Sequence, residues 1–326
     1  MTPASVNRRG EVIIINYVKH TSPEIPSQHA PAAVKRFNRG ALRSILAVLS
    51  NTKAIVGLFI IAVFVIIAVF APWIAPDNPT AEVYPLSQAP SFAHLFGTNA
   101  LGQDVFSQIV YGSRISLEVA FIAGVLATFI SLFVGVTAGY LRGWIDQLLS
   151  WLTNLFLVIP GMPLVIVLSS YMRFRGEWPI ITVIALTGWA WSARSLRAQT
   201  LSVRERDYVL HAKLVGQRWW SVVAGEILPN MASLVLSGLL FSMISALLTE
   251  AGLDFLGLGN VDVVSWGTML YWAQNNEALL NGLWWWFVPP GVAIALFGGA
   301  LALLNFSLDE ITNPRLRKRK VKVRAH

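Results

Sequence analysis

The feature that most constrains this chain is an apolar run at 54–74, "AIVGLFIIAVFVIIAVFAPWI", which carries no charged residue. A helix of about 20 apolar residues crosses a hydrocarbon core of about 30 Å, and Pro72 and Trp73 close the run where an interfacial belt is expected. Mostly polar residues precede it, and it is longer than the core of an ordinary signal peptide, so we expect it to remain in the membrane. Because 55% of residues are hydrophobic and 13% are charged, the chain is predicted to be an all-α integral membrane protein.

Further apolar segments bring the prediction to six transmembrane helices, which together form a permease domain at 54–306. The predicted spans are 54–74, 117–140, 147–172, 178–196, 231–252 and 284–306. Pro160, Gly161 and Pro163 interrupt the third span near its middle, so we expect a kink there. The chain has no cysteine, which excludes disulfides, thiolate catalysis and cysteine-ligated metals.

The distribution of Lys and Arg predicts the orientation. Eight lie in the tail 1–53, one in the connection between spans two and three, six in or beside 197–230 and seven in the basic tail 307–326. The opposite side receives only Arg114, Arg173 and Arg175. Under the positive-inside rule, both termini and the 197–230 loop are predicted to be cytoplasmic, while 75–113 and 255–283 lie outside.

The net charge of +8 follows from the same distribution, because basic residues that flank spans lie near anionic lipid headgroups. The run "PRLRKRKVKVR" in the C-terminal tail could also bind RNA. Its position directly after the last span favours membrane lipid, and we predict no nucleic-acid partner.

The 197–230 segment is too charged to cross lipid and lies between two apolar spans. Ser202 and Glu205 have the spacing of a capping box, which predicts a short helix at about 205–216, and Gly216 is placed to end it in a left-handed conformation. A second amphipathic piece follows, with Trp219 and Trp220 at headgroup depth, until Pro229 ends it. A cytoplasmic loop that is helical without a special role remains the alternative.

This segment resembles the cytoplasmic loop signature of ABC importer permeases, which has the form E-A-A, three residues, Gly, about ten residues and I-L-P. The triplet here is Leu210-His211-Ala212, the glycine is Gly216, and the ending is Ile227-Leu228-Pro229. The glycine and the ending match the signature, whereas the first two triplet positions differ from it and lack its acidic residue.

Three other blocks resemble the C-type permease of dipeptide and oligopeptide importers. They are 94–120, "HLFGTNALGQDVFSQIVYGSRISLEVA", in which Asn99, Gln103 and Gln108 replace the usual Asp, Arg and Arg, then 250–270, "EAGLDFLGLGNVDVVSWGTML", and 308–317, "LDEITNPRLR". With the loop signature, these ordered blocks cover roughly residues 50 to 317. The resemblance implies the type I ABC importer transmembrane-domain fold in a bacterial or archaeal inner membrane.

The resemblance also implies partners. The chain would pair with a second permease, two cytoplasmic ATPase subunits that bind ATP and Mg, and an external solute-binding protein. Since no G-x-x-x-x-G-K-[ST] motif is present, ATP hydrolysis is not assigned to this chain, and no catalytic residue, cofactor or metal is predicted in it. The helix near 205–216 would act as a lever in a groove of one ATPase. The residues assigned to this coupling are Asp207, Leu210, His211, Ala212, Leu214, Gly216, Ile227, Leu228 and Pro229.

Two other functional classes find less support. An ion-coupled secondary carrier is expected to place ionisable groups near the bilayer midplane, whereas Glu250 and Asp254 lie toward the outer end of the fifth span. A membrane enzyme needs a catalytic cluster, but the histidines are scattered; they are His20, His29, His94, His211 and His326. Glu250, Asp254 and Trp266 remain candidates for the pathway or an outer gate. For Glu250 we favour a helix-end carboxylate solvated at the interface.

The substrate is expected to be a peptide, with an oligosaccharide as the alternative. The outer segment 270–287, "LYWAQNNEALLNGLWWWF", is rich in Trp, Asn and Gln, which suit stacking and hydrogen bonding to sugars. An aromatic belt at the entry to the sixth span explains the same residues.

Overall fold

The computed structural model describes residues 5–6, 12–13, 51–172 and 176–312. The chain divides into two units, Met1–Arg43 and Ser44–His326. In the first unit β1 (Ser5–Val6) pairs antiparallel with β2 (Val12–Ile13). Most of the predicted tail 1–53, and the basic tail beyond residue 312, lie outside the described residues.

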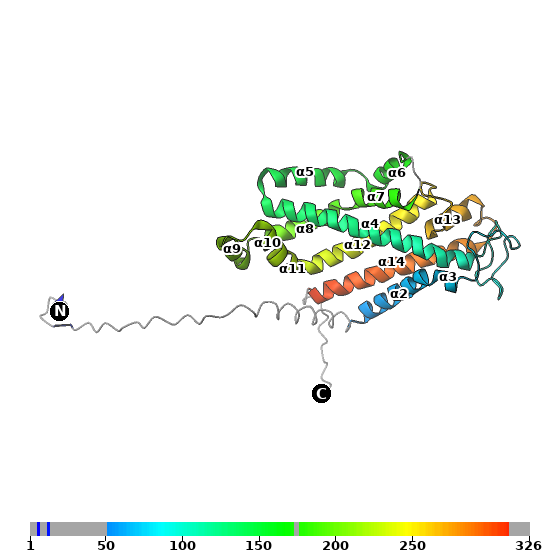
Figure 1. Cartoon of the computed structure of the whole chain (residues 1–326), viewed down its shortest axis with the longest axis horizontal. Coiled ribbons are helices and arrows are strands. Elements are labelled where there is room, and N and C mark those ends of the chain that lie inside the picture. The colour runs from blue at the N-terminus through cyan, green and yellow to red at the C-terminus, as the bar shows by residue number, and fades with distance from the viewer. Residues whose placement is uncertain (1–4, 7–11, 14–50, 173–175, 313–326) are drawn as a thin grey trace, which may run out of the picture. The chain divides into compact units, whose positions relative to one another are not determined.

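The second unit is built of helices (Figure 1). Its elements are α2 (Thr52–Val69), α3 (Ala71–Ile74), α4 (Val105–Leu141), α5 (Gly143–Val158), α6 (Gly161–Ser170), α7 (Glu177–Gly188), α8 (Ala190–Val203), α9 (Asp207–Leu214), α10 (Trp219–Val222), the π-helical turn η1 (Val223–Ile227), α11 (Leu228–Asn230), α12 (Ala232–Phe255), α13 (Trp266–Asn275) and α14 (Trp284–Thr312). The long helix α4 packs along α8 and α12, and α14 packs against α2 and α12. The short helices α9 to α11 lie at one end of this unit, and α3 and α13 lie at the other.

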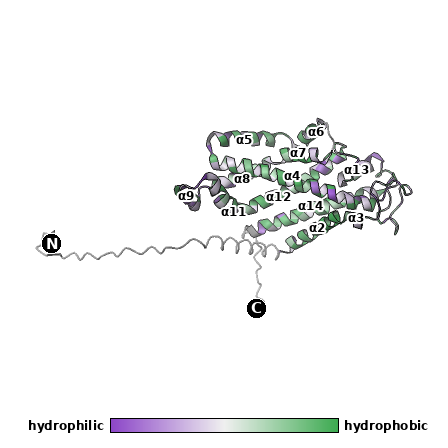
Figure 2. Ribbon diagram, viewed as in Figure 1, coloured by the Kyte–Doolittle hydropathy of each residue, from purple (hydrophilic) through white to green (hydrophobic). Residues whose placement is uncertain are grey.

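Among the described residues, four helices are long and apolar enough to cross a membrane, namely α2, α4, α12 and α14 up to Glu310. Figure 2 shows hydrophobic residues along these helices and hydrophilic ones gathered around α9 and α13. The pair α5 and α6 makes a fifth crossing if it is one broken span, and α7 is a shorter apolar helix. Helix length and composition therefore give four or five spans where six were predicted.

The predicted kink in the third span is confirmed. α5 ends at Val158, α6 begins at Gly161, and the two helices are bent by 89°. The cause is local, because the residue before a proline is driven out of the helical region. Ile159, which precedes Pro160, has φ −72° and ψ 127°.

α4 begins twelve residues before the predicted second span. Its 37 residues extend about 55 Å, well beyond a hydrocarbon core of about 30 Å. Asp104 caps its start, since the Asp104 side chain accepts a hydrogen bond from the Ser107 amide at 2.8 Å. The first turns bury the polar side chains of Ser107, Gln108 and Ser116 against neighbouring segments. Hydropathy missed these turns because tertiary contacts, rather than lipid, surround them.

Close packing between α4 and α8 depends on two glycines one helical turn apart. A methyl group on Gly135 would lie 2.5 Å from the Ala193 carbonyl oxygen, and one on Gly139 would lie 2.7 Å from Thr200 Cβ. Small residues at this spacing let membrane helices approach closely. α8 therefore packs closely against α4, and the short helices that follow α8 in the sequence are connected to this packed pair.

Candidate coupling surface and outer polar cluster

α9 is anchored by a small apolar core at its end of the second unit. Val209 and Ala212 on its inner side are buried. They belong to a cluster that contains Leu196, Val203, Val209, Ala212, Val222, Ile227 and Met231. These residues come from α8, α9, α10 and η1, and from Met231 directly before α12. The short helices α9 and α10 are therefore packed against α8 and the start of α12.

The start of α9 differs from the prediction, and the capping box was wrong. Ser202 lies inside α8, and α9 begins at Asp207 after an extended Arg206, with no side-chain cap. Glu205 instead accepts a hydrogen bond from Arg142 Nη2 at 2.7 Å. The sequence spacing could not reveal this partner, because Arg142 comes from the end of α4.

The end of α9 confirms the predicted left-handed glycine. Gly216 has φ +79°, its amide donates to the Lys213 carbonyl at 3.0 Å, and the Gln217 amide donates to the Ala212 carbonyl at 3.2 Å. These two bonds form a Schellman motif, which satisfies the last carbonyls of a helix. Pro229, in contrast, does not end the following piece. It lies within α11, and the helical conformation is interrupted two residues later, at Met231.

The outward side of this region carries apolar side chains. Leu210, Leu214, Val215, Trp219 and Trp220 are all exposed, with Leu214 at 85%, and we call these five residues the α9 surface. Side chains of this kind are stabilised by contact with the membrane interface, where Trp219 and Trp220 are predicted to lie, or with a protein partner. Of the other residues assigned to coupling, Asp207, His211, Gly216 and Pro229 are exposed, Leu228 is half-buried, and Ala212 and Ile227 are buried.

Basic groups surround the α9 surface. Lys213 Nζ lies 4.9 Å from the centre of the Tyr140 ring, and the Arg218 guanidinium lies 5.2 Å from the Trp220 ring. Arg204 donates a short hydrogen bond to the Tyr140 carbonyl. Burial, and then the positive charge of Arg204, lower the pKa of Lys213. Two of these basic groups therefore lie against aromatic rings at the α9 end, where the acidic residues Glu205 and Asp207 are exposed as well.

At the other end, Glu250 is buried, and the favoured interpretation of a solvated helix-end carboxylate was wrong. Its side chain is 1% exposed, because the segment after α12 and α13 covers it. Glu250 Oε1 accepts from Ser116 Oγ at 3.2 Å, and the same hydroxyl accepts from the Trp266 amide at 3.2 Å. Ser265 Oγ donates to Asp254 Oδ2 at 2.5 Å. These groups join α4, α12 and α13 at the end of the unit opposite α9.

Trp266 is a core residue in this structure. It is completely buried, its ring centre lies 5.4 Å from that of Phe64, and its Nε1 donates to the Ile109 carbonyl at 3.1 Å. Nearby, a methyl group on Gly259 would lie 1.9 Å from Asp254 Oδ1, so the segment "FLGLG" lets the backbone approach this carboxylate. These contacts favour structural roles for Trp266 and Asp254, and a role in the pathway or gate stays a prediction.

The three positions at which 94–120 departs from the family pattern meet in space. Gln103 Oε1 accepts from Asn99 Nδ2 at 2.8 Å and from Gln108 Nε2 at 2.7 Å. Gln108 Nε2 also donates to the Pro79 carbonyl at 3.1 Å. All three side chains are buried, and we call them the amide cluster. Sequence reasoning noted each replacement but missed the cluster, although the joint loss of all three charges was a signal for it.

Asp77, His94 and Asp104 could hold a metal by their spacing, since their ligand atoms all lie within 4.8 Å of one another. Each already has a partner. His94 Nδ1 lies 3.0 Å from Asp104 Oδ1, and the Tyr84 hydroxyl donates to Asp77 Oδ1 at 2.5 Å. The bond to Asp77 raises the pKa of Tyr84. These hydrogen bonds account for the grouping without a metal.

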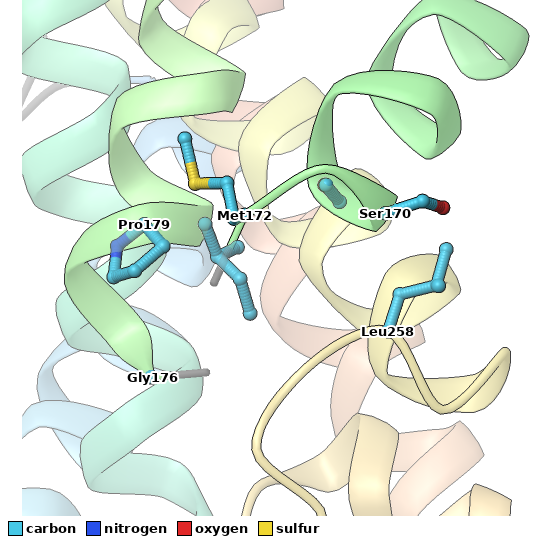
Figure 3. A pocket seen from close by; sticks show the side chains of 7 residues that line it. Ser170, Met172, Gly176, Pro179 and Leu258 are labelled. Atoms are coloured by element: carbon cyan, nitrogen blue, oxygen red, sulfur yellow. The ribbon is translucent and has the colours of Figure 1, made fainter. Parts of the chain in front are cut away.

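A small cavity of about 70 Å³ lies at the bend between the third and fourth predicted spans (Figure 3). Ser170 and Met172 come from the end of α6 and the turn after it, Gly176 and Pro179 from the start of α7, and Leu258 from the segment after α12. The end of α6 therefore lies beside the C-terminal end of α12.

Comparisons with known proteins agree with these features. Residues 128–318 match the family model "binding-protein-dependent transport system inner membrane component", and residues 45–91 match "N-terminal TM domain of oligopeptide transport permease C". The dipeptide transport system permease protein DppC of Bacillus subtilis is 32% identical over 270 residues, which cover 82% of this chain and 83% of that protein. The oligopeptide transport system permease protein OppC of the same organism is 32% identical over 272 residues, covering 82% and 88%. A putative peptide permease protein of Brucella suis is 32% identical over 290 residues, covering 88% and 94%.

Proposed function

Because the chain belongs to the family of binding-protein-dependent transport system inner membrane components, as a permease subunit of the peptide type, we propose that it forms half of the translocation pathway of an ATP-driven oligopeptide importer. The observation that carries the proposal is its similarity to dipeptide and oligopeptide permeases over about four-fifths of its length. Members of this family are permease subunits and not catalysts.

Peptide is favoured over oligosaccharide as the substrate. The relatives named above are all peptide permeases by their names. Two of the outer tryptophans that suggested sugar binding use their indole N–H groups internally. Trp272 Nε1 donates to the Val261 carbonyl at 3.0 Å, and Trp285 Nε1 donates to the Thr98 carbonyl at 3.1 Å. The oligosaccharide alternative therefore has less support than the residue composition suggested.

The α9 surface is the proposed docking site for an ATPase subunit. It is apolar, exposed and attached to α8 and α12 through a packed core, so a movement of the docked subunit would be transmitted to the long helices as a body. The remaining proposed partners are a second permease, a second ATPase and an external solute-binding protein. ATP and Mg would be bound by the ATPase subunits.

Six crossings and a cytoplasmic α9 are proposed on the following grounds. Asn51 Nδ2 donates to Glu310 Oε2 at 3.0 Å, so α2 starts on the side where α14 ends, which requires an even number of crossings. α4 ends and α12 begins at the α9 end of the unit. Between these two helices in the sequence, the turn from α6 to α7 lies beside Leu258, at the opposite end of the unit. That excursion accounts for two crossings in addition to α2, α4, α12 and α14. The positive-inside rule places the α9 end in the cytoplasm.

Cysteine labelling tests this topology, because the chain has no cysteine of its own. Ser91→Cys and Asn276→Cys should react with an impermeant maleimide in intact cells or spheroplasts. Ser221→Cys should react only after the membrane is permeabilised. Labelling of Ser221→Cys in intact cells, or failure at both outer positions, would overturn the proposed orientation.

A second experiment tests the division of labour. The purified chain should neither hydrolyse ATP nor take up peptide, whereas the complex with the second permease and both ATPases should do both in proteoliposomes that contain the solute-binding protein. ATP turnover by the rigorously purified chain alone would contradict the proposal. Uptake of maltotriose without uptake of trialanine would mean that the importer carries oligosaccharides instead of peptides.

A further inference from the structure

A cavity of about 170 Å³ lies between α4, α8, α12 and α14, and none of the predicted sites includes it. Polar side chains from all four helices line it, namely Thr128, Ser131, Ser192, Ser195, Ser237 and Asn305. Three of these helices, α4, α12 and α14, are long and apolar enough to cross a membrane. Hydroxyl groups are therefore gathered at a depth where lipid surrounds the outside of the bundle.

The hydroxyl groups on the α8 and α12 sides of the cavity reach the surface of the chain. Thr128 and Ser131 on α4 are buried, and they donate to backbone carbonyls of their own helix. Ser195 is exposed, and its hydroxyl has no partner among the described residues. A polar group left in hydrocarbon without a hydrogen bond is costly, so Ser195 is expected to face water or a polar ligand.

The same polar surface continues along α12. Ser237, Phe241 and Ser245 are spaced four residues apart, which places them on one side of the helix, and Ser245 is exposed near the middle of this span. We call Ser195, Ser237 and Ser245 the serine surface. α4 behaves differently, because Phe129, the neighbour of Thr128, is 67% exposed. The bundle thus has an aromatic side that suits lipid and a hydroxyl side that does not.

The serine surface is electrically neutral. Among the described residues, no Asp, Glu, Lys, Arg or His lines the cavity. The charged neighbours have opposite signs, because Arg194 precedes Ser195 on α8, and Asp309 Oδ1 accepts from Ser237 Oγ at 3.2 Å. A surface of this kind neither selects nor repels a ligand by the sign of its charge.

We propose that the serine surface is this chain's wall of the water-filled translocation pathway, and that its neutrality lets peptides pass whatever the charge of their side chains. The inference rests on the proposed function as a peptide importer. A hydroxyl group both donates and accepts, so it can replace water around the N–H and carbonyl groups of any peptide unit. Trp191 and Phe241, which line the same cavity and are exposed, offer apolar surface to the peptide side chains.

Cysteine accessibility tests the wall in the assembled complex in inside-out membrane vesicles. The probe is methanethiosulfonate ethyltrimethylammonium, a small water-soluble cation, and its reaction is followed by the mass increase of this chain. Ser195→Cys and Ser245→Cys should react at least about tenfold faster than the control Phe129→Cys, because the reactive thiolate forms in water and not in an apolar setting. Equal rates would mean that the serine surface faces lipid, and no reaction at either serine position would mean that protein covers it. Both results overturn the inference.

Charge introduced at Ser195 tests the neutrality. Uptake of Ala-Lys-Ala and Ala-Glu-Ala by the complete system is compared as a ratio to the parent, which cancels the preference of the solute-binding protein. Ser195→Asp should raise the ratio of the lysine peptide to the glutamate peptide at least about threefold, and Ser195→Lys should lower it similarly. Ser221→Asp and Ser221→Lys, at an exposed position outside the lining, are the controls and should leave the ratio unchanged.

The outcomes separate this inference from the proposed function. If the parent system takes up both peptides but their ratio does not respond to the charge at Ser195, the inference fails while the proposed function stands. If the parent system takes up neither these peptides nor trialanine, the proposed function as a peptide importer fails.

Discussion

The two ends of the helical unit handle polar and apolar side chains in opposite ways. The end with α13, which we propose to be the outer end, buries polar groups beneath α13 and the adjoining segments, among them Glu250, Asp254 and the amide cluster. The end with α9 does the reverse and exposes Leu210, Leu214 and the paired tryptophans. A buried polar group must find its partners within the protein, whereas an exposed apolar patch is stabilised by a partner from outside. The comparison teaches that the end with α13 satisfies most of its buried polar groups within this chain, whereas the α9 end leaves large apolar side chains uncovered by the described residues, as the proposed docking of another subunit requires.

The largest expected effect is on assembly. Leu214→Asp places a charge in the centre of the α9 surface, and it should weaken binding of the ATPase subunit by about 2 kcal/mol or more, roughly thirtyfold, as at an interface hot spot. Leu280→Asp is the matched control, because Leu280 is 82% exposed but lies at the outer end. Co-purification with the ATPase and its apparent affinity would be compared for the two variants. Similar affinities would mean that the α9 surface is not the docking site.

The buried cluster at the outer end should respond in stability instead. Ser116→Ala removes the hydroxyl that links Glu250 to the Trp266 amide, and the loss should lower the free energy of unfolding by about 1–3 kcal/mol. Thermal unfolding of the purified chain in detergent would measure it. Ser221→Ala, at an exposed position near α9, should leave the melting temperature unchanged. A Ser116→Ala protein as stable as the parent would show that the outer end does not depend on this link.

Gly216→Val tests whether the left-handed end of α9 matters mechanically. A methyl group at this position would have no neighbour within 4 Å, so the cost, at least about 1 kcal/mol, comes from the positive φ alone. Gly225→Val is a close control, since Gly225 also faces open space but has no positive φ. In proteoliposomes Gly216→Val should reduce receptor-stimulated ATP turnover and peptide uptake together, and Gly225→Val should reduce neither. If a stably assembled Gly216→Val complex shows unaltered ATP turnover and peptide uptake, the left-handed end of α9 is not required for coupling.

The smallest effect is expected for the ion pair between Arg142 and Glu205. Both side chains are more than half exposed, and exposed pairs contribute between 0 and about 1 kcal/mol. Arg142→Gln should therefore shift the melting temperature only slightly, and the shift should shrink further as salt is added. A large loss of stability would mean that the α9 end relies on its charges more than on the apolar core beneath α9.

Local signals in the sequence were sufficient for several features. The helical membrane class follows from apolar runs, the 89° bend follows from Pro160, and the end of α9 follows from Gly216. In each case the cause acts within a few residues, through hydropathy, the missing proline N–H or the tolerance of glycine for positive φ. The family resemblance likewise depends on ordered motifs that can be recognised without coordinates.

Tertiary structure decided what depends on residues distant in sequence. The capping box at Ser202 failed because α8 continues through it and Glu205 pairs with Arg142, which comes 63 positions earlier. Glu250 seemed solvated at the end of a span, yet the segment that follows folds back over it. The first turns of α4 escaped the hydropathy pattern because protein surrounds them. Hydropathy measures a preference for lipid over water, and it carries no information about a third environment, the polar interior that only folding creates.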